Sequence, residues 1–451
     1  MIKMMLSEAA IPAEAELTGE DVRFSGCSTD SREIQPGQMF IALRGERFDG
    51  HAFLNQARKA GACAALVERA SGVDGMPLLV VDDSRKAMGR LARYWRGEFE
   101  LPLIALTGSN GKTTVKEMLA SILGLEAPVL STRGNLNNDI GVPLTLFQLG
   151  REHRYAVIEM GANHPGEIAW LSDLARPTVA LITQCAPAHL RGFGSIEGVA
   201  RAKAEIFDGL LENGTAIINA DDHYAAFWRK TAVTRRQLSF GIENKADVFA
   251  TEIIFNTEKN STDFLLHLPD FSAGISLPLP GIHNVLNALA AAACCIAVGV
   301  GGEVIKQGLE GISPVKGRMQ VKFIKPGVRL FDDTYNANPT SLRAALQVLV
   351  QYPGRHWLVL GDMGELGEAE KELHREAGEA ARKFGIDRLY AIGELSSHAV
   401  QGFGEGAQHF SRIEDLVNAL KDDLSEGITI LVKGSRAMAM ERVINGLSGE
   451  N

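Results

Sequence analysis

The sequence predicts an α/β protein of three domains. The chain has 451 residues, which exceeds one ordinary domain and is typical of two or three. From about residue 100 onward, short apolar runs alternate with stretches of helical length, and this alternation is typical of parallel strands covered by helices. A Pro- and Gly-containing stretch, GISPVKGRMQ at 311–320, interrupts that alternation and indicates a second boundary. We therefore expect domains at 1–99, 100–313 and 314–451.

The first block mixes short strands with turns. Its most informative stretch is STDSREIQPGQMFIALRGERFDGHAFL at 28–54. We interpret this stretch as a strand, a Pro-Gly turn, a second strand and a turn rich in Gly and Asp. The block is thus expected to form a small α/β domain.

The second block carries the clearest strand–helix alternation. Helices are expected to begin at Lys112, after Pro165, after Ser195 and at about residue 283. Residues 246–280 are more strand-like and predict an antiparallel edge of the sheet. The apolar strands are LIALT (103–107), AVIEM (156–160), TVALITQ (178–184) and GTAIINA (214–220). A mostly parallel sheet follows from this order.

The third block repeats the pattern on a smaller scale. A helix is expected over 369–384, among the strands HWLVLG (356–361), RLYAIG (388–393) and ITILVKG (428–434). This order predicts a second, Rossmann-like parallel sheet.

Composition and charge exclude several classes of protein. No apolar run reaches the length of a membrane span, and the N-terminus lacks the basic start and apolar core of a signal peptide. The net charge is −9, with 46 basic and 55 acidic residues and no basic block, which argues against nucleic-acid binding. The five cysteines show no metal-type spacing, and Cys294 and Cys295 lie in an apolar helical run as core residues. We expect a monomer in a reducing cytoplasm.

A phosphate-binding loop is the strongest motif. The strict pattern requires a glycine where Leu106 stands, but the remainder is present between a strand and a helix, as Gly108, Ser109, Asn110, Gly111, Lys112, Thr113 and Thr114. Backbone N–H groups at a helix start hold phosphate oxygens. Lys112 would reach the β- and γ-phosphates, and Thr113 would place its hydroxyl on Mg²⁺. A glycine-rich turn with a surface lysine is the alternative. The central domain is therefore predicted to be of the P-loop type.

Lys203 lies on the apolar face of its expected helix. At 100° per residue, Ile196, Val199, Ile206, Phe207 and Leu210 form a stripe that contains it, while Arg201, Glu205, Asp208 and Glu212 lie opposite. Such an amine must be paired, shifted in pKa or chemically modified, or else its long stem reaches the surface. A shielded lysine can also react with carbon dioxide, and the carbamate could ligate Mg²⁺. Helix geometry does not decide between these readings.

Two further candidate ligands follow strands of the same sheet. Glu159 ends AVIEM, and His189 follows TVALITQ within CAPAHLRGFG. Ligands of open parallel sheets bind at the carboxyl ends of strands, so both should converge on the phosphate loop. A strand-end salt bridge and an ordinary loop histidine are the alternatives.

These motifs, from TDSR (29–32) to KGSR (433–436), resemble the Mur ligases, ATP-dependent enzymes of peptidoglycan synthesis. The resemblance is closest to the branch that adds a D-alanyl-D-alanine dipeptide. It rests on TGSNGKTTVKEM, GNLNNDIGVPLTL, EMGANHPGEI, DDTYNANPTS and GDMGELG. No DNPR motif of the branch that adds the third amino acid is present, and GKTT replaces the GKGS usual in folylpolyglutamate synthetases.

The resemblance implies roles for residues in all three domains. Lys112, Lys203, His189 and Glu159 would be catalytic, and Thr113, Glu159, His189 and carbamylated Lys203 would hold two Mg²⁺ ions. ATP would also contact Asn284 and Asn287 near the adenine, with Arg318 and Asp333 from the third domain. The UDP-sugar would contact Ser31, Arg32, Phe40, Asp49 and His51, the last two in the GERFDGH turn. Asn137 and Asn138 would face the acceptor, and Asn336, Asn338, Pro339 and Thr340 the dipeptide. Tyr335 stands where several members carry an ATP-contacting lysine, so that role is not assigned.

The implied reaction is an ATP-dependent ligation. The terminal carboxylate of UDP-N-acetylmuramoyl-tripeptide would form an acyl phosphate, which the amine of D-alanyl-D-alanine would attack to give the pentapeptide, ADP and phosphate. Closure of the third domain, with hinges near 100 and 313, would exclude water. A kinase that stops after phosphoryl transfer, a nucleotide-driven switch and a sister ligase with another amine are the alternatives.

Overall fold

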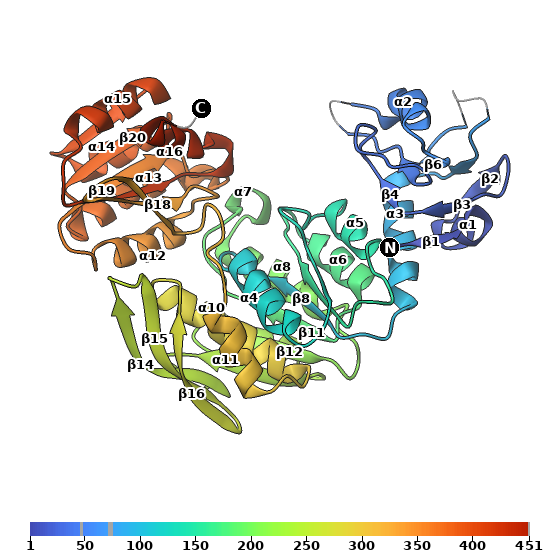
Figure 1. The fold of residues 1–451 in the computed structure, drawn as a ribbon, viewed down its shortest axis with the longest axis horizontal. Coiled ribbons are helices and arrows are strands. Elements are labelled where there is room, and N and C mark those ends of the chain that lie inside the picture. The colour runs from blue at the N-terminus through green and yellow to red at the C-terminus, as the bar shows by residue number, and fades with distance from the viewer. Residues whose placement is uncertain (46–47, 71–74, 450–451) are drawn as a thin grey trace.

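The computed structural model describes residues 1–45, 48–70 and 75–449 and folds into three lobes (Figure 1). The N-terminal and C-terminal lobes stand on either side of a central lobe. Over the described ranges, no helix is both long and apolar enough to cross a membrane.

The N-terminal lobe is built on a small mixed sheet. Its order is β2-β7-β6-β5-β4, and only the edge strand β2 runs antiparallel to its neighbour. A separate pair, β1 and β3, is antiparallel. The strands are β1 Lys3–Met5, β2 Glu16–Thr18, β3 Arg23–Ser25, β4 Cys27–Ser28, β5 Met39–Ile41, β6 Ala64–Val67 and β7 Leu78–Val80, and the helices are α1 Leu6–Ala13, η1 Gly50–Phe53, α2 Leu54–Lys59 and α3 Ser84–Gly97.

The sequence predicts a strand that begins at Ser28, and this prediction is wrong for every residue after Ser28. β4 ends at Ser28, and a turn follows in which Arg32 donates its backbone N–H to Asp30 Oδ1 at 2.9 Å. Aspartate favours such turns because its side chain bonds the backbone two residues on. The second strand, β5, is where the sequence predicts it.

The central lobe contains the expected mostly parallel sheet. Its order is β16-β15-β14-β13-β12-β11-β8-β10-β9, parallel from β9 to β14, and β14, β15 and β16 form the predicted antiparallel edge. The strands are β8 Leu103–Thr107, β9 Val129–Ser131, β10 Tyr155–Glu159, β11 Val179–Ile182, β12 Thr215–Asn219, β13 Arg236–Gly241, β14 Val248–Asn256, β15 Ser261–Leu268 and β16 Phe271–Leu277.

Helices cover both faces of this sheet. α4 and α10 pack on one face, and Cys294 and Cys295 lie in its core as predicted. α6 packs on the other face, where α3 of the N-terminal lobe lies against it. The helices are α4 Lys112–Gly124, α5 Gly141–Leu146, α6 Glu167–Ala175, α7 Leu190–Phe193, α8 Ile196–Ala204, η2 Glu205–Phe207, α9 Ala225–Thr231, α10 Ile282–Ala297 and α11 Gly302–Glu310.

The helix predicted after Ser195 is shorter than its hydrophobic stripe indicates. α8 ends at Ala204, and a 3₁₀ turn, η2, continues the chain. Val199 is buried, as are Ile206 and Phe207 in η2 and Leu210 after it, but Ile196, in the first turn of α8, is 39% exposed.

The C-terminal lobe is a six-stranded sheet of order β17-β18-β22-β19-β20-β21, parallel except for β17 at its edge. Apolar cores lie on both of its faces. The strands are β17 Gln320–Lys325, β18 Val328–Asp333, β19 Arg355–Gly361, β20 Arg388–Ile392, β21 Ala407–Phe410 and β22 Ile428–Lys433. The helices are α12 Pro339–Leu349, η3 Gly367–Ala369, α13 Glu370–Lys383, α14 Ser396–Phe403, α15 Ile413–Asp423, η4 Arg436–Met438 and α16 Glu441–Ser448.

Each sheet falls within one predicted block, whereas the domain limits at 99/100 and 313/314 stay predictions.

The turn between β14 and β15 of the central lobe docks on the C-terminal lobe. Tyr352, which follows α12, is buried, and its hydroxyl donates to Asn260 Oδ1 in that turn. The ring of Phe255 meets Tyr352 edge-on, with centroids 5.3 Å apart. This contact joins the lobes away from the phosphate loop.

Tyr352→Phe is expected to lower the free energy of unfolding by about 1 kcal/mol, because it removes one buried hydrogen bond and keeps the ring. Urea denaturation followed by circular dichroism measures the change. Phe323→Ala is the control, since Phe323 is 70% exposed and its loss should cost less than about 0.5 kcal/mol. Equal stability of Tyr352→Phe and the parent protein would show that the hydroxyl contributes nothing.

Candidate active site

The phosphate loop lies between β8 and α4, and two of its glycines are sterically required. A Cβ on Gly108 would lie 1.7 Å from the Thr183 hydroxyl oxygen. Gly111, the N-cap of α4, has φ +83°, and its Cβ would lie 2.4 Å from Asn287 Oδ1. Any larger residue would push the loop away from these neighbours. The loop therefore keeps its backbone close to β11 and α10.

Lys112 folds over this loop. Its ammonium donates to the Gly108 carbonyl oxygen at 2.7 Å. Burial lowers the pKa of Lys112, and the negative charge of Glu159 partly offsets that shift. The amine thus sits at the N-terminus of α4, where backbone N–H groups favour an anion.

Thr113 and Glu159 meet beside the loop, as the strand order requires. β8 lies between β10 and β11, so the carboxyl ends of these three strands adjoin. The Thr113 hydroxyl donates to Glu159 Oε2 at 3.1 Å, and Asn137 Nδ2 donates to Glu159 Oε1 at 2.8 Å. Arg318, from the segment before β17, donates to Thr113 Oγ1 at 3.3 Å. The site already contains a buried carboxylate beside a hydroxyl, with an arginine from the C-terminal region.

Lys203 lies in α8 and is 6% exposed, so of the alternatives left open by the sequence its side chain is buried and does not reach the surface by its stem. Burial, followed by the charge of Lys112, lowers its pKa to about 7. Within the described ranges, no hydrogen bond or ion pair reaches its amine. A substantial fraction of this lysine is therefore an uncharged amine near neutral pH.

His189 is the N-cap of the short helix α7 and has a left-handed backbone, with φ +54°. Its Nδ1 atom faces the carboxylate of Glu365 from the C-terminal lobe, without hydrogen-bond geometry. The structure thus pairs His189 with a residue that was not among the predicted ligands.

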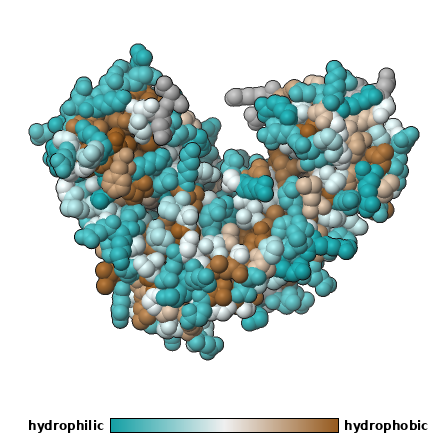
Figure 2. Space-filling view, viewed as in Figure 1, coloured by the Kyte–Doolittle hydropathy of each residue, from teal (hydrophilic) through white to brown (hydrophobic). Residues whose placement is uncertain are grey.

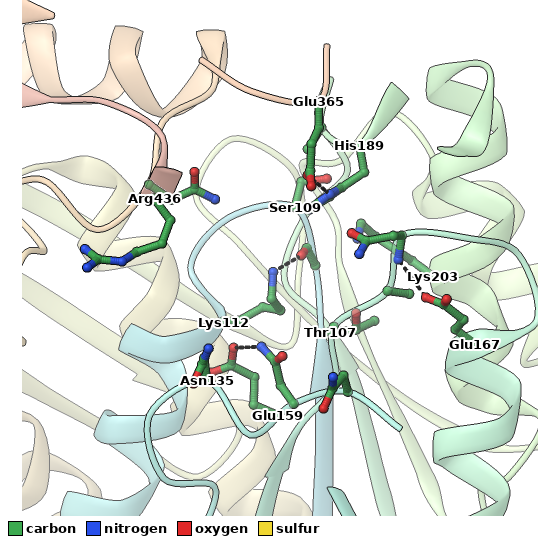
Figure 3. A pocket seen from close by; sticks show the side chains of 18 of the residues that line it. Thr107, Ser109, Lys112, Asn135, Glu159, Glu167, His189, Lys203, Glu365 and Arg436 are labelled. Atoms are coloured by element: carbon green, nitrogen blue, oxygen red, sulfur yellow. Dashed lines mark hydrogen bonds and ion pairs between the residues drawn. The ribbon is translucent and has the colours of Figure 1, made fainter. Parts of the chain in front are cut away.

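One cavity of about 820 Å³ collects these side chains between the lobes. Figure 2 shows the molecule hollowed between the N-terminal and C-terminal lobes, and Figure 3 shows Lys112, Glu159, Lys203 and the His189–Glu365 pair around one space. Of the predicted residues, the cavity is lined by Gly108, Ser109, Asn110, Gly111, Lys112, Asn137, Asn138, Glu159, His189, Lys203, Arg318, Asn336 and Asn338. Thr113 is buried directly behind it.

A second cavity of about 140 Å³ opens on the other side of Arg318. Phe240, Leu279 and Leu286 give it apolar walls. The predicted residues that line it are Asn110, Gly111, Thr114, Asn284, Asn287, Arg318, Asp333 and Thr340. Its size and its mixed apolar and amide lining suit a planar base.

The residues expected at the dipeptide do not all face the same space. Asn336 and Asn338 line the large cavity, Thr340 lines the small one, and Pro339, the first residue of α12, lines neither. Asn338 caps α12, and its Nδ2 donates to Asn110 Oδ1 of the phosphate loop at 2.7 Å. Asn338 therefore connects the C-terminal lobe to the nucleotide loop.

The residues expected at the UDP-sugar lie in the N-terminal lobe, outside both cavities. Arg32 pairs with Asp30 at 2.6 Å, and Ser31, between them, is buried. Phe40 is 1% exposed and packs in the lobe's core, so its side chain is closed to a ligand here.

His51, in the GERFDGH turn, bonds Asp49 Oδ1 through Nδ1 at 2.6 Å and accepts the Glu68 N–H through Nε2 at 2.9 Å. Both of its ring nitrogens therefore stabilise the local fold. Residues 46 and 47 of this turn lie outside the described residues.

Several cavity residues were not among the predictions, and three of them are ionisable groups close to predicted residues. His283 precedes Asn284 in the small cavity, and burial lowers its pKa to about 4, so its imidazole is uncharged at neutral pH. Lys433 is buried and pairs with Asp333, while donating to the Asn336 carbonyl at 2.9 Å. Glu365 lines the large cavity. Lys433 and Glu365 lie within the quoted motifs KGSR and GDMGELG, and His283 directly precedes the predicted Asn284; these positions were the available signal.

Three segments of the chain match known domain families. Residues 23–96 match the Mur ligase family catalytic domain, residues 106–295 the Mur ligase middle domain, and residues 317–436 the Mur ligase glutamate ligase domain.

Similarity extends along the whole chain. The UDP-N-acetylmuramoyl-tripeptide–D-alanyl-D-alanine ligase of Escherichia coli K12 is 46% identical over 449 residues, 99% of each chain. A crystal structure of MurF from Acinetobacter baumannii superposes with a TM-score of 0.94 at 40% identity, covering 100% of this chain and 99% of that one. The MurF ligase of Thermotoga maritima in complex with ADP superposes with a TM-score of 0.83 at 30% identity, covering 94% and 97%. Because relatives this similar share its three lobes from end to end, the chain belongs to the Mur ligase family.

Proposed function

We propose that this protein joins D-alanyl-D-alanine to UDP-N-acetylmuramoyl-tripeptide and cleaves ATP to ADP and phosphate. The observation that carries this proposal is the single cavity where the phosphate loop, Glu159 and Lys203 meet asparagines from two lobes. Such a cavity can hold a nucleotide, an acid and an amine together, as a ligase requires. The Escherichia coli relative, which is named for this reaction, supports the assignment.

ATP binds with its phosphates on the loop at 108–114 and its adenine in the small cavity. Asn284 and Asn287 offer amide groups to the base, and Asp333 offers a carboxylate to the ribose. The Thermotoga maritima relative in complex with ADP supports use of this nucleotide. The UDP-sugar binds the N-terminal lobe, and the dipeptide binds the C-terminal lobe.

The first step transfers the γ-phosphoryl group. A carboxylate oxygen of the tripeptide attacks the γ-phosphorus, the bond from that phosphorus to the β–γ bridging oxygen breaks, and ADP leaves. Two anions approach each other, so positive charge must offset their repulsion. Lys112 and Arg318 supply charge at the loop, together with the N-terminus of α4.

The second step forms the peptide bond. The uncharged amine of D-alanyl-D-alanine attacks the acyl carbon, the tetrahedral intermediate expels inorganic phosphate, and the nitrogen loses a proton. An acyl phosphate hydrolyses in water, so the lobes must exclude it. The bonds from Asn338 to Asn110 and from Arg318 to Thr113 support a closed arrangement.

The residues at the loop fit Mg²⁺, which takes hard oxygen ligands. Thr113 and Glu159 offer a hydroxyl and a carboxylate already in contact, and they would hold one ion. His189 and a carbamate on Lys203 would hold a second. The described residues contain no group of three His, Cys, Asp or Glu side chains arranged for a metal, so the carbamate would supply a ligand that the unmodified chain lacks. Bound Mg²⁺ supplies charge neutralisation on the phosphates.

The carbamate forms when the uncharged Lys203 amine attacks carbon dioxide. An N–C bond forms as one C–O π bond of carbon dioxide opens, the nitrogen loses one proton, and the uncharged amine becomes an anionic carbamate. The lowered pKa of Lys203 supports this step, because an ammonium has no lone pair to react. We also propose that the protein acts as a monomer in the cytoplasm.

Phosphate release from ATP, measured with UDP-N-acetylmuramoyl-tripeptide and with or without D-alanyl-D-alanine, tests the function. Release should require both substrates and yield the pentapeptide product by mass. Release without the dipeptide would favour a kinase or a nucleotide-driven switch, and release only with another amine would favour a sister ligase.

A further inference from the structure

The GDMGELG loop at 361–367 is held rigidly by its own lobe. Asp362 Oδ1 accepts the backbone N–H and the hydroxyl of Ser396 at 2.7 and 2.6 Å. Met363 donates its backbone N–H to His374 Nε2 at 2.9 Å, and Leu366 is buried. Within this framework, Glu365 is exposed and has a left-handed backbone, with φ +64°.

Glu365 projects from this loop across the boundary between lobes. Its carbonyl oxygen accepts the Arg191 N–H at 3.4 Å, and its carboxylate faces His189 (Figure 3). Both Glu365 and His189 hold the left-handed conformation, which costs free energy for residues other than glycine. The fold therefore holds the Glu365 carboxylate at this point of the cavity, although the left-handed backbone of Glu365 costs free energy.

The other carboxylates that line the cavity already have partners. Each belongs to the N-terminal or central lobe. Asp83 caps α3, Asp139 pairs with Arg85 at 2.8 Å, Glu159 accepts from Thr113 and Asn137, and Glu167 accepts the Asn163 N–H at 2.7 Å. Among the described residues that line the cavity, Glu365 is the one carboxylate from the C-terminal lobe, and it faces the ring of His189.

A carboxylate here would repel most of the substrates. ATP, the diphosphate of the UDP-sugar and the reacting end of the tripeptide are anionic, whereas the dipeptide presents an ammonium at its reacting end. Among these reacting groups, electrostatic complementarity therefore selects the dipeptide amine as the one that Glu365 can bind. The contact between His189 Nδ1 and the Glu365 carboxylate shows that a nitrogen group at the cavity wall can approach this carboxylate.

We propose that Glu365 binds the protonated amine of the incoming D-alanyl-D-alanine and holds its nitrogen beside the acyl carbon, so that the amine attacks the acyl phosphate once it has lost a proton to solvent. This inference rests on the proposed function and assigns the amine subsite within it. Glu365 is a substrate-binding residue of the second step and takes no part in phosphoryl transfer.

Glu365→Gln keeps the size of the side chain and removes its charge. Since hydrogen bonds to a charged group contribute more than neutral ones, the KM for D-alanyl-D-alanine should rise by about 10-fold or more. The KM values for ATP and UDP-N-acetylmuramoyl-tripeptide should stay within about two-fold, because neither reacting group is a cation. Glu365→Asp should restore part of the loss. Glu368→Gln is the matched control, because Glu368 is exposed in the same segment and lines neither cavity.

Hydroxylamine separates the two steps. It is largely uncharged near neutral pH and captures an acyl phosphate as a hydroxamate, so it needs no carboxylate to bind it. In Glu365→Gln, hydroxamate formation from UDP-N-acetylmuramoyl-tripeptide and ATP should proceed at the parent rate while dipeptide ligation falls.

Several outcomes would overturn the inference. An unchanged KM for the dipeptide would show that Glu365 does not bind its amine. Loss of hydroxamate formation as well would show that Glu365 acts through His189 or through closure of the lobes. A raised KM for the tripeptide substrate alone would assign the carboxylate to an amine on the acceptor peptide. If the parent protein itself forms no hydroxamate and no pentapeptide, the proposed function fails first.

Discussion

Lys112→Ala is expected to lower the rate of dipeptide-dependent phosphate release by about 10³-fold, because it removes a positive charge from the point where negative charge develops. The side chain is half-buried and bonds only its own loop at Gly108, so the fold should survive the change. Steady-state phosphate release at saturating substrates measures the effect.

Lys245→Ala is the control for Lys112→Ala. Lys245 is exposed in the central lobe and lines neither cavity, so this variant should keep the parent rate. A Lys112→Ala protein with parent-like circular dichroism and more than about a tenth of the parent rate would contradict a phosphate-binding role for this lysine, since one such group is usually worth more.

Lys203→Ala is expected to be nearly inactive and to regain part of its activity when short-chain carboxylic acids are added. The alanine leaves space at a buried position, and an added carboxylate can stand where the carbamate would lie. Activity as a function of acetate or formate concentration, at constant ionic strength, measures the rescue.

Arg201→Ala is the control for Lys203→Ala. Arg201 lies on the exposed face of α8, and within the described ranges its one ion pair is with Glu197, so its loss should leave activity unchanged and show no response to carboxylic acids. A folded Lys203→Ala protein that no carboxylic acid rescues would place the carbamate in doubt and favour an unmodified lysine at this site.

The local sequence was sufficient to predict the structure wherever a short segment determines its own conformation. The loop from Gly108 to Thr114, the strand before it and the helix after it all follow from glycine placement and periodicity. The antiparallel edge at 246–280 was also predicted, because its strand pattern lacks the intervening helices. Glu159 was expected beside the phosphate loop because ligands of open parallel sheets bind at the carboxyl ends of strands, and its contact with Thr113 agrees with this expectation.

Contacts between distant segments could not be predicted in this way. The strand after Ser28 ended early because Asp30 closes a turn, and α8 ended at Ala204 although its apolar spacing continued. No periodicity shows that Glu365 faces His189, that Asn338 bonds Asn110, or that Phe40 turns into a core rather than toward a ligand.

The sequence by itself determined the order of elements, the phosphate loop and the family resemblance, because each depends on residues close together in the chain. Only the tertiary structure decided which side chains share a cavity, because that depends on how the three lobes pack against one another. Glu365 illustrates the difference. In the chain it is one acidic residue of a glycine-rich loop, and in the folded protein it is the C-terminal lobe's carboxylate in the cavity that holds Lys112 and Lys203.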